Sequence, residues 1–278
     1  MNNLPISVIV IARNEENTIE ETLVSIQRNK PSEIIVVDGN SKDRTVEIAR
    51  RYTEHIYYDE GAGTGYARQL GAEQATQEYI AYVDTGIILT EGALATMLAE
   101  FLESDYISIS ARGMMDRQPS SYWEWGQDQH AQISQHENRP AQIGMSASLF
   151  RRKTILKYRF EVGYGPRMDD VDLSIRLRKD GYLHGYSSVR CYHHHEASLN
   201  GFIKHRILLG SGRCSYILKY GSWHAEFWPP ITTAYWLGFC LIKGNLKLLP
   251  YEAVAGVLDT AGLAKGFFLM IGGGSKKQ

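Results

Sequence analysis

The sequence predicts an α/β protein with an open, mostly parallel and twisted sheet that is flanked by helices. In the first half of the chain, short apolar runs alternate with amphipathic segments, which is the pattern of strand–helix repeats. Acidic or amide residues follow several of the apolar runs, where the strands of such a sheet would end. The aromatic, apolar tail from about residue 226 predicts a further, helical extension.

Hydrophobic periodicity predicts the first two strand–helix pairs. Residues 6–11 are predicted as a buried strand, and residues 14–28 as a helix with apolar side chains at helical spacing. Residues 34–37 predict a second strand. A second helix is expected over residues 41–51, with Ser41 as its N-cap.

The repeat continues with a short strand at residues 55–58, a helix at residues 65–75 and a fourth strand at residues 79–83. In an open α/β sheet, ligands bind beyond the carboxyl ends of the strands. The residues that follow the predicted strands are therefore the first candidates for a ligand site. They are Ala12, Arg13, Asn14, Asp38 and Asp84.

The pattern changes after about residue 106. Residues 107–111 predict a strand, and the stretch 128–142, which is rich in Gln, His, Asn and Pro, predicts a mobile surface segment. Order is expected again at residues 146–151. A helix is predicted over residues 171–179.

Composition limits the classes of function. Lys and Arg (30) nearly balance Asp and Glu (31), which argues against strong nonspecific binding of nucleic acid. Cys191, Cys214 and Cys240 have neither zinc-site spacing nor a disulfide framework, which suits a reducing compartment. The first residues show no basic region and no cleavage site, so we expect no signal peptide and a cytoplasmic protein.

Four segments in order carry a family resemblance. Residues 7–16 (SVIVIARNEE), 35–45 (IVVDGNSKDRT), 81–84 (AYVD) and 169–177 (DDVDLSIRL) resemble family 2 glycosyltransferases with the GT-A fold. The resemblance covers roughly residues 5 to 215. It implies inverting transfer of a sugar from a nucleotide diphosphate by direct displacement at the anomeric carbon, with Mn²⁺ or Mg²⁺ on the diphosphate.

The resemblance implies a division of the chain. We predict a GT-A domain over residues 1–225, with a nucleotide-binding half (1–105) and an acceptor-binding half (106–225). The length of 278 residues suits one large domain with an appendage. Residues 226–278 are then a helical extension that contacts a membrane surface or a second copy of the chain.

A nucleotide sugar needs fixed acceptors at the strand ends, and Asn14, Glu15 and Asp38 lie there. Capping of the next helix by Asn14 and Glu15, and a turn at Asp38, are the alternative readings. Arg68 is placed to face the diphosphate, although an ordinary solvated arginine is the alternative. The predicted nucleotide-sugar site comprises Ala12, Arg13, Asn14, Glu15, Asp38, Arg68, Asp84, Thr85, Gly86 and Asp169.

Asp84 is the expected ligand of the divalent cation and of the ribose. The family pattern is Asp-x-Asp, but Gly86 stands here in place of the second carboxylate. His193 and His195, which share one face of a predicted strand, are candidates to replace it, and imidazole favours Mn²⁺. The alternative for these histidines is a polar strand end.

Asp170 is the predicted catalytic base. An inverting transferase must deprotonate the acceptor hydroxyl as that hydroxyl attacks the donor. Asp169 and Asp170 form a carboxylate pair at a helix N-terminus, where the positive end of the helix dipole stabilises anions. Capping of the helix by Asp169 is the alternative, and it is compatible with catalysis.

The tail contains two apolar segments, residues 231–242 and 251–271. The first is short and the second is interrupted by charges, so neither is expected to span a membrane. Aromatic residues together with Lys243 and Lys247 resemble an interfacial surface, which would suit a polyprenyl-linked acceptor at the inner face of the cell membrane. A helical pair packed on the domain or on a second subunit is the alternative.

Two other functions compete with sugar transfer. A nucleotidyltransferase would need a glycine-rich, basic loop after the first strand, where this chain has an acidic, glycine-free segment. A non-catalytic nucleotide-sugar-binding protein would explain the glycine at position 86. The sequence leaves open whether the donor carries UDP, GDP or dTDP, and whether the acceptor is a glycan or a lipid-linked sugar.

Overall fold

The computed structural model describes residues 3–136, 143–161, 168–193, 195, 197–221 and 228–273. The backbone divides into two compact units. The first comprises Met1–Arg117, Ala131–Gly163 and Asp169–His194, and the second comprises Gln118–His130, Tyr164–Met168 and His195–Gln278.

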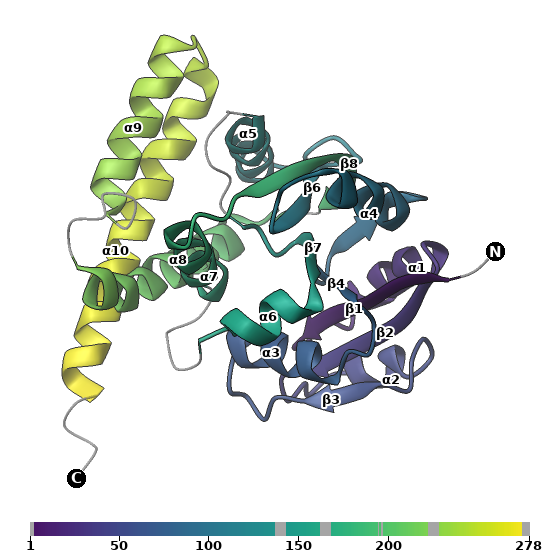
Figure 1. The fold of residues 1–278 in the computed structure, drawn as a ribbon. Coiled ribbons are helices and arrows are strands. Elements are labelled where there is room, and N and C mark those ends of the chain that lie inside the picture. Colours follow the sequence, from purple (N-terminus) through teal and green to yellow (C-terminus); the bar gives the residue numbers. More distant parts are fainter. Residues whose placement is uncertain are drawn as a thin grey trace. The chain divides into compact units, whose positions relative to one another are not determined.

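The first unit is built on an eight-stranded sheet with the order β3-β2-β1-β4-β7-β6-β8-β5 (Figure 1). The strands β1 to β4 run parallel where they pair, and β6 pairs in parallel with β8. Strands β7 and β5 are antiparallel to their neighbours, so the sheet is mixed. The strands are β1 (Leu4–Ala12), β2 (Pro31–Asp38), β3 (Ile56–Tyr58), β4 (Tyr79–Val83), β5 (Ile87–Leu89), β6 (Ser108–Met114), β7 (Ala147–Arg151) and β8 (His184–His193).

Helices cover both faces of this sheet. The period of two in β1 sends Ile6, Val8 and Val10 into one core cluster, and Ile9 into the other. The first cluster includes side chains of α1 and α4, and the second includes side chains of α3, α6 and α7. These helices are α1 (Ile19–Arg28), α3 (Thr64–Gln74), α4 (Ala93–Glu103), α6 (Arg152–Tyr158) and α7 (Asp169–Lys179), and a short α2 (Thr45–Ala49) follows β2.

The predicted α/β class is confirmed, but the first two helices begin later than the sequence indicated. Helix α1 begins at Ile19 rather than at Asn14, because Asn14 adopts a left-handed φ of 57°. Helix α2 begins at Thr45, and Ser41 is not its N-cap. Ser41 instead belongs to a turn in which its backbone N–H donates to Asp38.

The prediction of a mobile surface segment at residues 128–142 is wrong for its described part. Residues up to His136 belong to α5 (Tyr122–His136), and the Asp128 side chain is buried. Residues 137–142 lie outside the described residues. Polar composition gave no helical signal here, because the buried side chains of the helix are the acidic Glu124 and Asp128 rather than an aliphatic stripe.

The second unit is helical and contains α8 (Leu199–Tyr220), α9 (Pro229–Ile242), a short 3₁₀ turn (Leu246–Leu248) and α10 (Leu249–Gly273). Helix α10 approaches α8 closely through glycines. A Cβ atom on Gly210 would lie 2.2 Å from the backbone oxygen of Asp259, and one on Gly262 would lie 2.3 Å from that of Ile207. Small residues therefore allow the two helix backbones to pack together.

One helix of the tail differs from the sequence expectation. The segment Leu246–Met270 is long and apolar enough to cross a membrane, judged by length and composition alone. The sequence indicated that its charged residues would prevent a span. The segment contains four of them, which are Lys247, Glu252, Asp259 and Lys265. About one third of its apolar window (33%) is buried inside the protein.

Candidate active site

The loops after β1 and β2 are joined by hydrogen bonds. Ala12 and Asp38 are register partners at the ends of these strands. The Asn14 N–H donates to Ser41 Oγ over 2.9 Å, and the Asn14 side-chain oxygen accepts from the Lys42 N–H over 2.8 Å. The two loops thus form one ledge at the carboxyl edge of the sheet.

Two further hydrogen bonds join the two loops. The Glu15 N–H donates to Thr45 Oγ1 over 2.7 Å, and the Glu16 N–H donates to Asp43 over 3.1 Å. Asn14 is therefore a loop residue that connects two strand ends rather than a helix cap. The Arg13 side chain packs against Gly39.

Asp38, at this ledge, has one carboxylate oxygen that is available to a ligand. Its side chain is buried, and Oδ2 accepts from the Ser41 N–H over 3.0 Å. Its other oxygen, Oδ1, is buried and has no hydrogen-bond partner among the described residues. A buried acceptor without a partner is costly, so this atom is suited to receive an N–H or O–H donor from a ligand.

Arg68 joins two carboxylates that are far apart in sequence. Its Nη1 lies 2.6 Å from Asp169 Oδ2, and its Nη2 lies 3.1 Å from Asp84 Oδ1. Arg68 is buried, so the alternative of a solvated surface arginine is wrong. Burial would lower the pKa of Arg68, but the charges of Asp169, Asp84 and Asp170 outweigh burial and raise it.

This network was only partly visible in the sequence. Thr64 Oγ1 donates to Asp169 Oδ1 over 2.9 Å, and Thr64 was not among the predicted site residues. A signal was present in the glycine-rich run before it, where Gly63 adopts a φ of 103°. Gly65 allows α3 to approach α7, because a Cβ there would lie 3.1 Å from Asp169 Cβ and 2.9 Å from the Glu161 backbone oxygen.

Asp169 and Asp170 begin α7, in the first turn of that helix. Asp169 is buried and bound to Arg68 and Thr64. Asp170 is partly exposed, and one of its oxygens accepts from the Val171 N–H over 2.8 Å. Burial, and then the neighbouring charge of Asp169, raise the pKa of Asp170 to about 7. A carboxylate with that pKa is suited to accept a proton near neutral pH.

The segment after β4 makes a tight turn. Asp84 keeps about a third of its side chain exposed (36%), beside its contact with Arg68. Thr85 and Gly86 lead into β5, and Gly86 has a left-handed φ of 83° while its N–H donates to Thr22 Oγ1 over 3.0 Å. The turn geometry therefore favours glycine at the position of the missing carboxylate.

His193 lies at the end of β8, and its register partner on β5 is Ile87. This pairing brings the strand end of His193 to the segment that follows Asp84. His195 belongs to the second unit, and His194 and Glu196 lie outside the described residues. Among the residues that the structure describes, no three His, Cys, Asp or Glu side chains form a metal-binding group.

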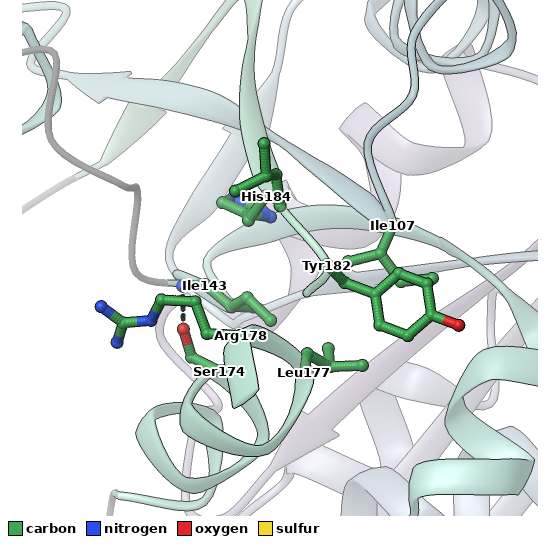
Figure 2. A pocket seen from close by; sticks show the side chains of 8 residues that line it. Ile107, Ile143, Ser174, Leu177, Arg178, Tyr182 and His184 are labelled. Atoms are coloured by element: carbon green, nitrogen blue, oxygen red, sulfur yellow. Dashed lines mark hydrogen bonds between the residues drawn. The ribbon is translucent and has the colours of Figure 1, made fainter. Parts of the chain in front are cut away.

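A separate small pocket lies beneath the start of β8 (Figure 2). Its lining includes Ile143, whose N–H points to Ser174 Oγ over 3.5 Å, and His184, whose pKa burial lowers to about 4. Strands β6 and β8 begin there, whereas Asp38 and Asp84 follow the ends of strands parallel to them. The pocket therefore lies at the opposite edge of the sheet.

Solved structures resemble three quarters or more of the chain. A mannosyltransferase from Pyrobaculum calidifontis, in complex with GDP-Man and Mn²⁺, superposes with a TM-score of 0.67 at 20% identity, over 96% of this chain and 88% of that one. Glucosyl-3-phosphoglycerate synthase from Mycobacterium tuberculosis, with Mn²⁺ and UDP, gives a TM-score of 0.55 at 17% identity, over 76% and 78%. The fold is thus that of the GT-A glycosyltransferases.

The chain belongs to glycosyl transferase family 2, whose sequence profile matches residues 7–160, more than half of the chain. It is an enzyme of the glycosyltransferase class, and the nucleotidyltransferase reading is set aside.

Curated relatives agree with this family. The chain is 36% identical over 41% of its length to 4,4'-diaponeurosporenoate glycosyltransferase of Staphylococcus haemolyticus. It is 24% identical over 91% of its length to poly-beta-1,6-N-acetyl-D-glucosamine synthase of Staphylococcus epidermidis. It is 26% identical over 67% of its length to a GalNAc(5)-diNAcBac-PP-undecaprenol beta-1,3-glucosyltransferase of Campylobacter jejuni. The chain spans 32%, 61% and 64% of the lengths of these relatives.

Proposed function

We propose that this chain is an inverting glycosyltransferase that moves one sugar from a nucleotide-diphosphate sugar to an acceptor hydroxyl, with Asp170 as the base. One observation carries the proposal. Arg68 ties Asp84, at the end of β4, to Asp169 beside the proposed base, over 3.1 Å and 2.6 Å. The donor edge of the sheet and the carboxylate pair therefore belong to one network within the first unit.

The proposed donor site uses the ledge between β1 and β2. The unpartnered Oδ1 of Asp38 would accept an N–H from the nucleobase, and the backbone of Ala12 and Arg13 would support the base and ribose. Asn14 and Glu15 would act through the loop conformation that they hold. Which nucleotide binds, UDP, GDP or dTDP, stays open to experiment.

Asp170 would take the proton of the acceptor hydroxyl on a carboxylate oxygen. Its raised pKa makes it a stronger base than an ordinary aspartate, and its partial exposure leaves it open to an acceptor. Asp169 cannot serve in the same way, because Arg68 and Thr64 already occupy its oxygens. The two neighbouring carboxylates would thus divide into a positioning group and a base.

A divalent cation fits the residues present. Asp84, Asp169 and Asp170 face a single guanidinium, so the site carries an excess of negative charge, and Asp84 is partly exposed. Within the first unit, Asp84 with His193 would hold Mn²⁺ or Mg²⁺. The ion would neutralise charge on the leaving diphosphate. With Arg68 still bound to Asp84 Oδ1, the ion would meet only the other oxygen of that carboxylate.

The acceptor class and the location are proposed from the relatives and the tail. One relative is named for an undecaprenol-linked acceptor, and another for polysaccharide synthesis. We therefore propose a glycan or polyprenyl-linked acceptor, and a location in the cytoplasm at the inner face of the cell membrane.

The proposal is tested with purified protein and a panel of UDP-, GDP- and dTDP-sugars. Slow hydrolysis of one donor identifies the nucleotide, and NMR of a transferred product gives the anomeric configuration. Asp170→Asn should reduce turnover by about 10² to 10⁴ while nucleotide binding is unchanged. Asp180→Asn, near the other end of the same segment, is the matched control. Retention of configuration, or full turnover in Asp170→Asn, would refute the mechanism.

A further inference from the structure

The turn between α9 and the 3₁₀ turn exposes a group of large apolar side chains. Ile242 is 85% exposed, and Leu241 and Leu246 are each 61% exposed. The turn itself is well formed, because the Asn245 N–H donates to the Cys240 oxygen over 2.8 Å and Gly244 adopts a left-handed φ. These side chains are therefore held in water by a defined turn rather than by fraying of a helix end.

Exposed apolar positions continue along α10 at helical spacing. Val257 and Phe268 are 69% and 77% exposed, and Ala261 and Ala264 are exposed between them. The intervals of four, three and four residues place these positions on one stripe of the helix. The other faces of α10 pack against α8 and α9 through Gly262, Gly266 and Gly256, where an added Cβ atom would lie within 3 Å of those helices.

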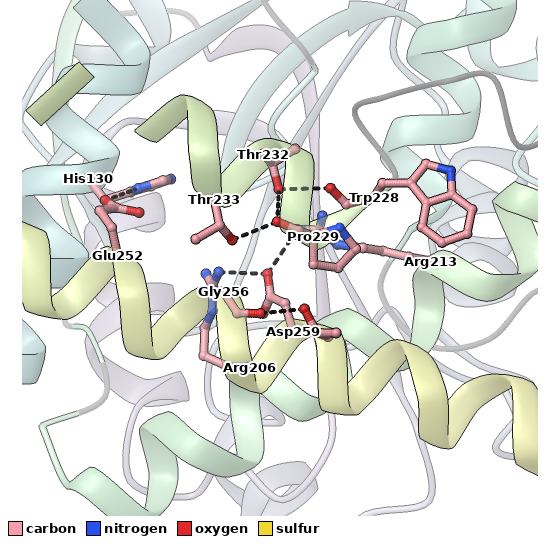
Figure 3. Close-up of polar contacts among 11 residues, drawn as sticks. His130, Arg206, Arg213, Trp228, Pro229, Thr232, Thr233, Glu252, Gly256 and Asp259 are labelled. Carbon is pink, nitrogen blue, oxygen red and sulfur yellow. Dashed lines mark hydrogen bonds and ion pairs between the residues drawn. The ribbon is translucent and has the colours of Figure 1, made fainter. Parts of the chain in front are cut away.

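The positive and negative side chains of this segment differ in exposure. Within the described residues 228–273, the exposed ionic side chains are Lys243, Lys247 and Lys265, and all are positive. The two acidic residues are buried and paired (Figure 3): Glu252 lies 2.8 Å from His130 Nδ1, and Asp259 pairs with two arginines. Those arginines are Arg206 at 2.7 Å and Arg213 at 3.1 Å.

We propose that the tail surface, defined as Leu241, Ile242, Lys243, Leu246 and Lys247 together with the α10 stripe, docks on a membrane of anionic lipids. Apolar side chains beside lysines are the composition of an interfacial anchor, and lysines are attracted to anionic headgroups. The inference rests on the proposed membrane location and not on the transfer chemistry.

Two other occupants fit the surface less well. A span by α10 would place in lipid a helix whose buried faces already pack on α8 and α9 and whose Asp259 is tied to two arginines. A twofold contact with a second copy would bring lysines against lysines, because the exposed charges have one sign.

The test is flotation of the full chain with vesicles of phosphatidylcholine, with and without phosphatidylglycerol. We expect binding only to the vesicles that contain phosphatidylglycerol, and weaker binding as salt rises. The double variant Ile242→Ser/Leu246→Ser should bind at least about tenfold more weakly. Lys243→Ser should bind about fivefold more weakly.

Matched controls come from the first unit. Leu102→Ser removes an exposed leucine (52%) from α4, and Lys153→Ser removes an exposed lysine from α6, so both should bind vesicles as the parent chain does. Equal binding to both kinds of vesicle, or unchanged binding by the tail variants, would overturn the proposal.

Further readouts separate the other occupants. If the tail variants alter mass in light scattering but not vesicle binding, a second copy covers the surface. If the bound chain resists extraction with alkaline carbonate, α10 spans the membrane. Donor hydrolysis in vesicle-free solution should be the same for the tail variants and the parent. Failure of docking is thus distinguishable from failure of the proposed transfer.

Discussion

Two buried arginine–aspartate networks in this chain have opposite balances of charge. In the first unit, one arginine meets two carboxylates: Arg68 is 8% exposed, Asp169 is 6% exposed and Asp84 is 36% exposed. In the second unit, two arginines meet one carboxylate: Arg206 and Arg213 are each 18% exposed, and Asp259 is 3% exposed.

The balance of charge indicates which of the two networks is suited to catalysis. The first has an excess of carboxylates, one member open to solvent, and Asp170 beside it with a raised pKa. This excess of negative charge is what the proposed binding of a cation and the proposed uptake of a proton both require. The second has its single carboxylate enclosed between two guanidinium groups and a closely packed helix pair, so it serves to hold α8 and α10 together.

The largest expected effects come from removing the minority charge of each network. Arg68→Met leaves carboxylates that face one another, and should cost about 3–5 kcal/mol of unfolding free energy at neutral pH. The guanidinium lowers the pKa of Asp170, which burial and Asp169 raise, so without it the folded-state pKa of Asp170 rises further. The folded state then binds more protons, so stability should recover as pH falls from about 7 towards 4.

Denaturant unfolding of Arg68→Met at several pH values measures this effect. Arg44→Met, which removes an exposed arginine paired with Glu16, is the control and should cost less than about 1 kcal/mol. A loss of stability that is the same at pH 5 and pH 7 would show that the carboxylates are not what Arg68 stabilises.

Asp259→Asn should cost a similar amount, about 3–5 kcal/mol, because two buried arginines lose their carboxylate. The loss should be measured at neutral pH, because burial raises the pKa of Asp259 and the parent chain therefore begins to lose this charge as pH falls. Thermal unfolding and donor hydrolysis of the folded fraction measure the two consequences separately. A loss of turnover without a loss of stability would contradict the structural role of this network.

The contrast also shows what the sequence could and could not reveal. The strands of the first half and the candidates Asp38 and Asp84 follow from local patterns, since polar residues after apolar runs mark strand ends, whereas Asp169 came from the carboxylate pair at a predicted helix start. The contact between Arg68 and Asp169 joins residues 101 positions apart, and no local pattern encodes it.

The sequence also did not reveal where α1 and α2 begin, or that α5 is a helix. Asn14 and Ser41 looked like helix starts, but hydrogen bonds between their two loops hold them outside α1 and α2. Helix α5 was missed because its buried side chains, Glu124 and Asp128, are acidic, and because its His130 pairs with the buried Glu252 of α10. Tertiary contacts overrode local preference in both cases.

The dependence of turnover on pH tests the protonation of Asp170 in the first network. Because burial and Asp169 raise the pKa of Asp170, turnover should fall about tenfold per pH unit below about pH 7, as Asp170 becomes protonated. The KM for the donor should change much less. Turnover that stays constant down to pH 5, in a range where the chain remains folded, would remove Asp170 as the base.

Replacement of a histidine tests the metal side of the first network. His193→Ala or His195→Ala should raise the Mn²⁺ concentration required for nucleotide binding by roughly tenfold, if that residue replaces the carboxylate missing at Gly86. His193 is favoured, because its strand end pairs with Ile87 beside the Asp84 segment. Titration calorimetry with nucleotide and Mn²⁺ gives the affinities, and His194→Ala is the control. Equal Mn²⁺ requirements in all three variants would leave the histidines without a role at the metal.

The smallest expected effect comes from restoring the absent carboxylate. Gly86→Asp should strengthen Mn²⁺-dependent nucleotide binding several-fold while costing about 1 kcal/mol of stability, because Gly86 has a left-handed φ of 83°. Space does not oppose the change, since a Cβ atom at this position meets no atom of the described residues within 4 Å, apart from its own chain neighbours. Gly86→Ala carries the same backbone strain without the carboxylate, so the difference between the two variants isolates the added ligand. If both variants bind Mn²⁺ and nucleotide alike, position 86 does not face the ion, and the glycine serves only the turn into β5.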